Sequence, residues 1–209
     1  MNNYRIPSFS EEKSLGAQGY RFVAGVDEVG RGPLAGPVVA AAVILPLNLK
    51  VRWLREVRDS KQLSSAKREF LYPLILEVAV SVAVGQAGHD VIDGRGIIVA
   101  TRMAMKLAID GLATSPDYLL IDYLSLPEVP LPQKGIVYGD GMCLSIACAS
   151  IVAKVTRDRM MVEFDKIYPG YRLAQHKGYG TGKHLECLNR LGPCPIHRRT
   201  FRPLKDRVY

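Results

Sequence analysis

The sequence predicts an α/β fold, with a mixed five-stranded sheet flanked by helices and a helical segment near the C-terminal end. Two observations lead to this prediction. Short apolar runs of strand length alternate with longer runs in which apolar residues recur at helical spacing. The first two strand-like runs are joined by a short turn, whereas helical runs precede the third and the fourth. A turn suits antiparallel neighbours and a helical crossover suits parallel ones, so both kinds of pairing are expected.

The predicted strands are short and strongly apolar. The second is almost wholly apolar, and the turn before it contains Pro33, Gly36 and Pro37. The fourth ends directly before Asp122, and the fifth leads to Asp140. In chain order the strands are expected at residues 21–29, 38–45, 80–85, 118–121 and 135–137. Sites in such sheets gather at the carboxyl ends of strands, which directs attention to these acids.

The predicted helices carry apolar residues at helical spacing. In the first, Ser64 or Ser65 is expected as the N-cap, and Pro73 is expected to shorten or kink the helix. The helices are expected at residues 64–79, 91–112, 142–167 and 183–191. A glycine-rich loop, residues 178–182, precedes the last of them. With neither a repeat nor a low-complexity linker, we expect a polar N-terminal extension, residues 1–18, and a single domain, residues 19–209.

Two adjacent acids, Asp27 and Glu28, close the first strand and are followed at once by a Gly-Arg-Gly turn. An unpaired buried charge is very costly, so a partner is required. A divalent metal ion is one such partner, since Mg²⁺ is held by a few carboxylates, waters and substrate phosphates. If the strands lie side by side, Asp122 and Asp140 join the first two acids at one edge of the sheet.

Other roles remain open for each acid alone. Asp27 or Glu28 could pair with a buried Arg or Lys, Asp122 could cap a turn, and Asp140 could be the N-cap of the long helix. Neighbouring side chains of a strand point to opposite faces, so Asp27 and Glu28 share a site only if the backbone turns there. Together with the Gly-Arg-Gly turn, the four acids favour a metal site.

Composition narrows the class of partner and the compartment. The 209 residues carry a formal charge of +8, and 48% are hydrophobic, so we expect a folded protein that binds an anionic partner. The polar N-terminus and the lack of a long apolar run predict a cytoplasmic protein without a membrane anchor. The four cysteines include no Cys-x-x-Cys pair, so we interpret them as reduced packing residues.

The C-terminal segment, residues 171–209, is strongly basic and can bind a duplex backbone without recognising its sequence. Two glycine-rich stretches resemble nucleotide-binding motifs only in composition. Residues 30–36 have the wrong glycine spacing for a dinucleotide loop and precede a strand. Residues 177–184 place Lys177 where a P-loop needs its first glycine, and His184 where it needs Ser or Thr.

With the acids placed, the chain closely resembles the ribonuclease HII family, the type 2 ribonucleases H, from about residue 21 to 203. The resemblance rests on several ordered motifs. They are Gly25-Val26-Asp27-Glu28-Val29-Gly30-Arg31-Gly32-Pro33-Leu34, Asp59-Ser60-Lys61, Leu120-Ile121-Asp122, Gly139-Asp140, Ala149-Ser150-Ile151-Val152-Ala153-Lys154-Val155-Thr156-Arg157-Asp158 and His176-Lys177-Gly178-Tyr179-Gly180-Thr181.

The resemblance implies a ribonuclease H-like fold and an endonuclease. It would cleave the RNA strand of RNA–DNA hybrids and cut 5′ to ribonucleotides embedded in duplex DNA, leaving 3′-hydroxyl and 5′-phosphate ends. It implies two divalent ions, Mn²⁺ or Mg²⁺, held by Asp27, Glu28, Asp122 and Asp140. We expect a monomer. Rival hypotheses are a related nuclease, such as an exonuclease or a Holliday-junction resolvase, and a non-catalytic nucleic-acid-binding protein.

The resemblance also implies substrate contacts. The backbone of Gly30, Arg31 and Gly32 would recognise the ribose 2′-hydroxyl, which distinguishes RNA from DNA, and Tyr179 would contact the sugar at the RNA–DNA junction. Phosphate contacts are expected from the basic side chains of Lys61, Lys154 and Arg157. A structural role is favoured for His176, His184 and His197. Tyr123, Gln62 and Cys148 depart from the family pattern, and Tyr123 is expected to affect substrate placement.

Overall fold

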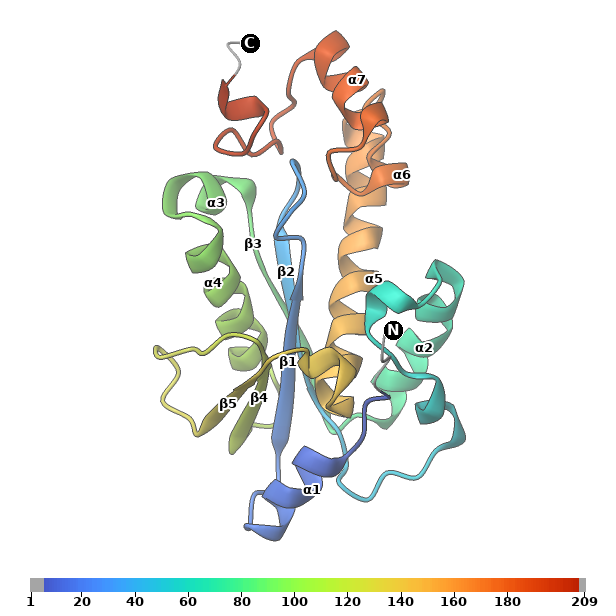
Figure 1. The fold of residues 1–209 in the computed structure, drawn as a ribbon, viewed down its shortest axis with the longest axis vertical. Helices are drawn as coiled ribbons and strands as arrows, with labels where there is room; N and C mark the ends of the chain where they lie inside the picture. The colour runs from blue at the N-terminus through green and yellow to red at the C-terminus, as the bar shows by residue number, and fades with distance from the viewer. Residues whose placement is uncertain (1–5, 207–209) are drawn as a thin grey trace.

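A five-stranded sheet runs through the centre of the protein in the computed structural model, which describes residues 6–206 (Figure 1). The strands are β1 (Val23–Val29), β2 (Val38–Ile44), β3 (Ser81–Ala87), β4 (Tyr118–Asp122) and β5 (Gln133–Ile136). Their order across the sheet is β3-β2-β1-β4-β5. The pairs β1–β2 and β2–β3 are antiparallel, and β1–β4 and β4–β5 are parallel, which confirms the predicted mixed sheet.

Helices cover both faces of this sheet (Figure 1). One face packs against α3 (His89–Arg95) and α4 (Ile97–Asp110), and the other against α2 (Ser65–Val78) and α5 (Leu144–Ile167). The remaining helices are α1 (Ser10–Ala17), α6 (Leu173–His176) and α7 (Gly182–Leu191), with short 3₁₀ turns η1 (Arg52–Glu56), η2 (Ser60–Gln62), η3 (Gly139–Gly141) and η4 (Leu204–Asp206). In Figure 1, α6 and α7 lie near the far end of α5.

Strand β2 is buried along its whole length because it lies inside the sheet and both of its faces are covered. Ala40 and Ala42 face the α4 side, whereas Ala41 and Val43 face the α5 side. Helix α5 approaches β1 very closely at Gly25, where a Cβ atom would lie 2.2 Å from the Ser145 backbone carbon. This contact fixes the long helix against the strand that carries Asp27.

One predicted helix is divided in the structure for a local reason. The single helix expected over residues 91–112 is two helices, because Gly96 has φ +82°, a left-handed conformation that glycine adopts easily. Pro73 lies inside α2 without ending the helix. The predicted cap of α2 is confirmed at Ser64, whose side chain accepts a hydrogen bond from the Lys67 N–H.

The long helix begins at Leu144, with Cys143 in the N-cap position, so Asp140 is not its N-cap. Helix α1 lies within the predicted N-terminal extension, whose first five residues fall outside the described part of the chain. Helix α1 contacts α5: the buried Glu12 side chain accepts hydrogen bonds from the Ser145 N–H and hydroxyl. All four cysteines are buried free thiols, as expected.

Candidate active site

The pairing of β1 with β4 brings Asp27 beside Asp122. In the parallel register, Val26 is opposite Ile121, so the next residue on each strand is an aspartate. Carboxylate oxygens of Asp27, Glu28 and Asp122 all lie within 4.8 Å of one another. The predicted convergence of acids at the carboxyl ends of parallel strands is therefore confirmed for these three residues.

The backbone does not turn between Asp27 and Glu28, although the sequence predicted that the two acids could share a site only with a turn at this point. Strand β1 continues to Val29, with Glu28 still opposite Ala40 of β2. Glu28 lies beyond the last residue of β4, so no residue of that strand pairs with it. The long glutamate side chain therefore reaches the same site. The chain turns only afterwards, at Gly30 with φ +95°.

Asp140 lies beside this trio rather than within it. It follows β5 in the η3 turn, and the preceding Gly139 donates its N–H to Asp122 at 2.7 Å. Asp140 is 7% exposed, and its neighbours include Asp59. Burial and the charges of Asp59 and Asp122 raise the pKa of the Asp140 carboxyl to about 7. Sequence reasoning did not select Asp59 as a site residue, although it belongs to the quoted Asp59-Ser60-Lys61 motif.

Burial is the largest cause of the raised pKa values of Asp27, Glu28 and Asp122 in the acidic cluster, and repulsion between carboxylates adds to it. Arg31 compensates only in part, since its Nη1 lies 3.4 Å from the Glu28 Oε1. The buried Glu28 Oε2 has no hydrogen-bond partner among the described residues. An unpartnered carboxylate oxygen amid other carboxylates suits a hard divalent cation, which takes oxygen ligands.

An open pocket of about 610 Å³ adjoins the acids. Its lining includes Glu28 together with six of the residues expected to bind substrate: Gly30, Arg31, Gly32, Lys61, Lys154 and Tyr179. These residues come from the β1–β2 turn, the η2 turn, α5 and the loop before α7. The fold thus gathers four segments distant in sequence around one pocket. Ser150 and Phe201, which the sequence did not single out as site residues, also line it.

Arg157 does not line this pocket, and its expected phosphate contact does not fit the structure. Its side chain is fully buried. The guanidinium donates to the carbonyls of Pro37 (2.9 Å), Lys177 (2.9 Å) and Ala35 (3.0 Å). Arg198, also fully buried, donates to the carbonyls of Gly30, Arg31 and Gly36. Both arginines therefore hold the loop that follows β1, rather than presenting charge to solvent.

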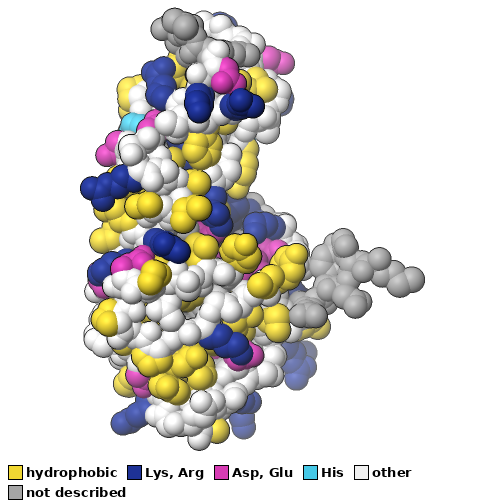
Figure 2. Space-filling model, turned by 60° about the vertical axis from the view of Figure 1, so that its left-hand side comes forward, with side chains coloured by type: hydrophobic (Ala, Val, Ile, Leu, Met, Phe, Trp, Pro, Cys, Tyr) yellow, Lys and Arg dark blue, Asp and Glu magenta, His cyan; other side chains and the backbone are white. Residues whose placement is uncertain are grey.

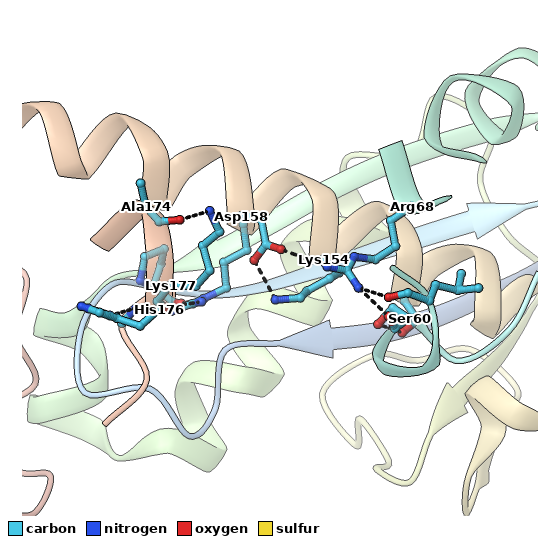
Figure 3. A network of polar contacts seen from close by, with 12 residues as sticks. Ser60, Arg68, Lys154, Asp158, Ala174, His176 and Lys177 are labelled. Atoms are coloured by element: carbon cyan, nitrogen blue, oxygen red, sulfur yellow. Dashed lines mark hydrogen bonds and ion pairs between the residues drawn. The ribbon is translucent and has the colours of Figure 1, made fainter. Parts of the chain in front are cut away.

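A network of charged and polar groups fixes Lys154 at the pocket (Figure 3). Lys154 Nζ lies 2.7 Å from Asp158, and Asp158 lies 3.5 Å from Arg68 of α2. Arg68 in turn donates to the Ser60 carbonyl at 2.9 Å, in the turn that carries Lys61. One connected set of contacts thus links the Lys154 side chain to the backbone of the turn that carries Lys61.

Tyr123 departs from the family pattern and has an unusual backbone. It has φ +59°, directly after the third acid, and its side chain is 64% exposed. It is absent from the residues lining the pocket.

Figure 2 shows lysine and arginine side chains on the upper part of the molecule, where the basic C-terminal segment lies. No helix within residues 6–206 is long and apolar enough to cross a membrane.

A mixed sheet with buried carboxylates at the ends of adjacent strands, beside a pocket lined by lysines, defines a metal-dependent nuclease of the ribonuclease H class. Residues 24–204 match the model of the family described as Ribonuclease HII. The chain therefore belongs to the ribonuclease HII family, and it is a metal-dependent ribonuclease H, an enzyme that hydrolyses RNA paired with DNA.

Similar proteins cover nearly the whole chain. A ribonuclease HII of Dehalococcoides mccartyi is 60% identical over 202 residues, which are 97% of this chain and 95% of that protein. A ribonuclease HII of Geobacter metallireducens is 54% identical, covering 98% and 99%. Among solved structures, ribonuclease H2 from Pyrococcus horikoshii OT3 aligns with a TM-score of 0.74 at 26% identity, over 88% of this chain and 96% of that one.

A more distant structure supports the fold alone. Bst-RNase HIII, solved in complex with Mn²⁺, aligns with a TM-score of 0.65 at 19% identity, over 88% of this chain and 68% of that one. The predicted α/β ribonuclease H-like fold is therefore confirmed by both the sheet topology and the structural relatives.

Proposed function

We propose that the enzyme cuts within the RNA strand of RNA–DNA hybrids and also 5′ to single ribonucleotides in duplex DNA, leaving 3′-hydroxyl and 5′-phosphate ends. One observation carries the proposal. A single pocket combines Glu28 of the acidic cluster, the Gly30-Arg31-Gly32 backbone and Tyr179. Groups suited to phosphodiester hydrolysis thus lie beside groups suited to recognising one ribose and the sugar that follows it.

Asp27, Glu28, Asp122 and Asp140 are the residues that would hold two divalent ions, Mg²⁺ or Mn²⁺. The raised pKa of these buried and half-buried carboxyls and the unpartnered Glu28 oxygen support this assignment. When bound, such ions activate water and stabilise the charge on the leaving oxygen.

The protein's own groups position the substrate. Gly32 has open space where a Cβ would lie, so a sugar can approach the backbone there, whereas the corresponding space at Gly30 is filled by Arg157. The carbonyls of Gly30 and Arg31 already accept hydrogen bonds from Arg198. Burial lowers the pKa of Lys61, whereas the negative charges of Asp59 and Asp27 raise it. The charges outweigh burial, so the pKa lies above its ordinary value and the lysine stays charged. Lys61 and Lys154 are therefore suited to binding phosphate beside the acids.

We further propose that the enzyme acts as a monomer in the cytoplasm. Four buried free thiols suit a reducing compartment.

The test uses a DNA duplex that carries one ribonucleotide, incubated with Mg²⁺, with Mn²⁺ or with EDTA. We expect one metal-dependent cut on the 5′ side of the ribonucleotide, and no cut in the matched all-DNA duplex. Cleavage of a long RNA–DNA hybrid without cleavage at a single ribonucleotide would contradict the junction role of Tyr179. Cleavage of the all-DNA duplex would favour the related-nuclease hypothesis, and binding without any turnover would favour the non-catalytic one.

A further inference from the structure

Three histidine rings pack behind the loop that carries Tyr179, and the proposed reaction does not use them. The rings of His176 and His184 are stacked with centroids 4.2 Å apart, and the rings of His184 and His197 are 5.2 Å apart. His184 and His197 have no exposed surface, and His176 is 9% exposed. The group is built from α6, α7 and the segment after α7.

The hydrogen bonds determine which nitrogen of each ring carries the proton. The Tyr179 carbonyl oxygen can only accept, so His184 Nδ1, 2.9 Å away, carries the proton of that ring. His184 Nε2 is then an acceptor, and His197 Nε2, 3.0 Å away, must donate to it. His197 Nδ1 consequently accepts, and the Cys194 N–H donates to it at 3.0 Å, although the Cys194 carbonyl also lies 3.2 Å away. Each assignment follows from the preceding one, because a neutral imidazole has one donor and one acceptor.

His176 fits the same scheme from the other side of the loop. Its Nδ1 accepts from the Gly178 N–H at 3.2 Å, and its Nε2 donates to the Tyr171 carbonyl at 2.8 Å. Burial lowers the pKa of all three rings, and His184 and His197 fall to about 4. The rings are neutral at pH 7, as this pattern requires.

The His184 ring and its backbone N–H hold the loop backbone between Tyr179 and Thr181. The Tyr179 carbonyl accepts from both the His184 ring and the Thr181 N–H, the latter at 2.8 Å. The Thr181 hydroxyl in turn accepts from the His184 N–H and caps α7. The loop therefore has a fixed backbone, while the Tyr179 side chain remains 40% exposed at the pocket.

We propose that His184, which accepts a hydrogen bond from His197, is a positioning residue that holds Tyr179 for recognition of the RNA–DNA junction. This inference rests on the junction role assigned to Tyr179 under the proposed function. His184 does not touch the substrate: it orients the backbone of the residue that does. It therefore determines preference between substrates more than it determines the chemical step.

The decisive variants differ in which nitrogen they imitate. His184→Asn places an amide nitrogen where Nδ1 lies and can still donate to the Tyr179 carbonyl. His184→Gln places its amide near the Nε2 position, where it faces His197 instead. Both are polar and smaller than or similar in size to histidine, so the pair is matched. His89 lies in α3, away from these rings, and His89→Gln is the control.

The measurement is kcat and KM on a single-ribonucleotide duplex and on a long RNA–DNA hybrid, and the readout is the ratio of kcat/KM between them. We expect His184→Gln to lower the single-ribonucleotide preference by roughly two- to tenfold, the range that one hydrogen bond supplies. His184→Asn and His89→Gln should keep the wild-type ratio, and Tyr179→Ala should lower it at least as far as His184→Gln does. Equal ratios in His184→Asn and His184→Gln would overturn the proposal.

A spectroscopic measurement separates this inference from the proposed function. Long-range ¹⁵N–¹H correlation spectra of the wild-type protein report the tautomer of each histidine. We expect a proton on Nδ1 of His184 and on Nε2 of His197 and His176. A proton on Nε2 of His184 would overturn the proposed hydrogen bond from His184 to the Tyr179 carbonyl, even if the enzyme cuts at single ribonucleotides. If the wild-type enzyme shows no such cut, the proposed function fails instead, whatever the tautomers are.

Discussion

Glu12 of α1 caps the N-terminus of α5 through Ser145, 133 residues further along the chain. The Glu12 Oε1 accepts from the Ser145 N–H at 2.9 Å and from its hydroxyl at 2.7 Å. The local N-cap residue of α5, Cys143, provides no side-chain hydrogen bond, so the capping group comes from the N-terminal helix. A carboxylate near a helix N-terminus also interacts favourably with the helix dipole.

Glu12→Ala is therefore expected to destabilise the protein by about 2 kcal/mol, since it removes a buried helix cap. Glu12→Gln keeps an acceptor oxygen and should cost less. The matched control is Glu11→Ala, which removes only an exposed ion pair with Lys134 and should cost less than about 1 kcal/mol. Urea unfolding measures all three, and equal losses in Glu11→Ala and Glu12→Ala would contradict the capping role.

Asp27→Asn is expected to lower metal-dependent cleavage about a thousandfold, because a buried ligand oxygen worth several kcal/mol of charge stabilisation is lost. The same change removes one negative charge from the repulsive cluster, so the metal-free protein should become more stable. Activity assays and thermal unfolding in EDTA measure the two effects. Full activity in a folded Asp27→Asn protein would refute the assignment of the site.

The raised pKa of Asp140, about 7, makes stability depend on pH in a definite direction. Between the ordinary value near 4 and the folded value, the folded protein binds more protons than the unfolded chain. Stability without divalent ions should therefore fall as pH rises from about 4 to 7. Asp140→Asn should flatten this dependence, and Mn²⁺ should raise the melting temperature more at pH 7.5 than at pH 5. If the metal-free protein instead becomes more stable from pH 4 to 7, by the same amount in the wild type and in Asp140→Asn, the predicted role of Asp140 is contradicted.

Lys154 is expected to contribute one phosphate contact to substrate binding. Lys154→Met should reduce the slope of log binding constant against log salt by about 1 and weaken binding at low salt. The control, Lys166→Met, changes an exposed lysine near the end of the same helix, where it pairs with Glu163, and should leave the slope unchanged. Binding is measured with EDTA present to prevent cleavage. An unchanged slope in Lys154→Met would remove it from the binding surface.

The strands and the acids were predictable because their signals are local. A strand buried on both faces appears in the sequence as a continuous apolar run, and an acid at its end stands out. The break at Gly96 is also local, but a glycine within a helical pattern does not reveal its φ angle. The sequence contained less information about Glu12, because one buried acid in a polar segment looks like a solvated one. Its partner lies in a distant element.

The burial of Arg157 was also not predictable from the local sequence. Three residues after Lys154, it was expected on the same exposed basic face of α5. The C-terminal part of the chain packs over this end of the helix, with Met161, Leu173 and Leu188 in one apolar cluster. A long-range contact of this kind leaves no periodic signal. The guanidinium then finds its partners in backbone carbonyls of two separate loops.

Arg157→Lys should therefore act on stability rather than on phosphate binding. Lysine keeps the charge but cannot reproduce three directed hydrogen bonds from one planar group, so a loss of about 3 kcal/mol or more is expected. The control is Arg159→Lys on the same helix, whose exposed ion pair with Glu69 predicts a change below about 1 kcal/mol. The salt slope of substrate binding should stay at the wild-type value in Arg157→Lys. A stable Arg157→Lys protein combined with a slope lowered in a charge-removing Arg157→Met variant would instead place this side chain against phosphate. The loop from Gly30 to Pro37 would then have to open when substrate binds.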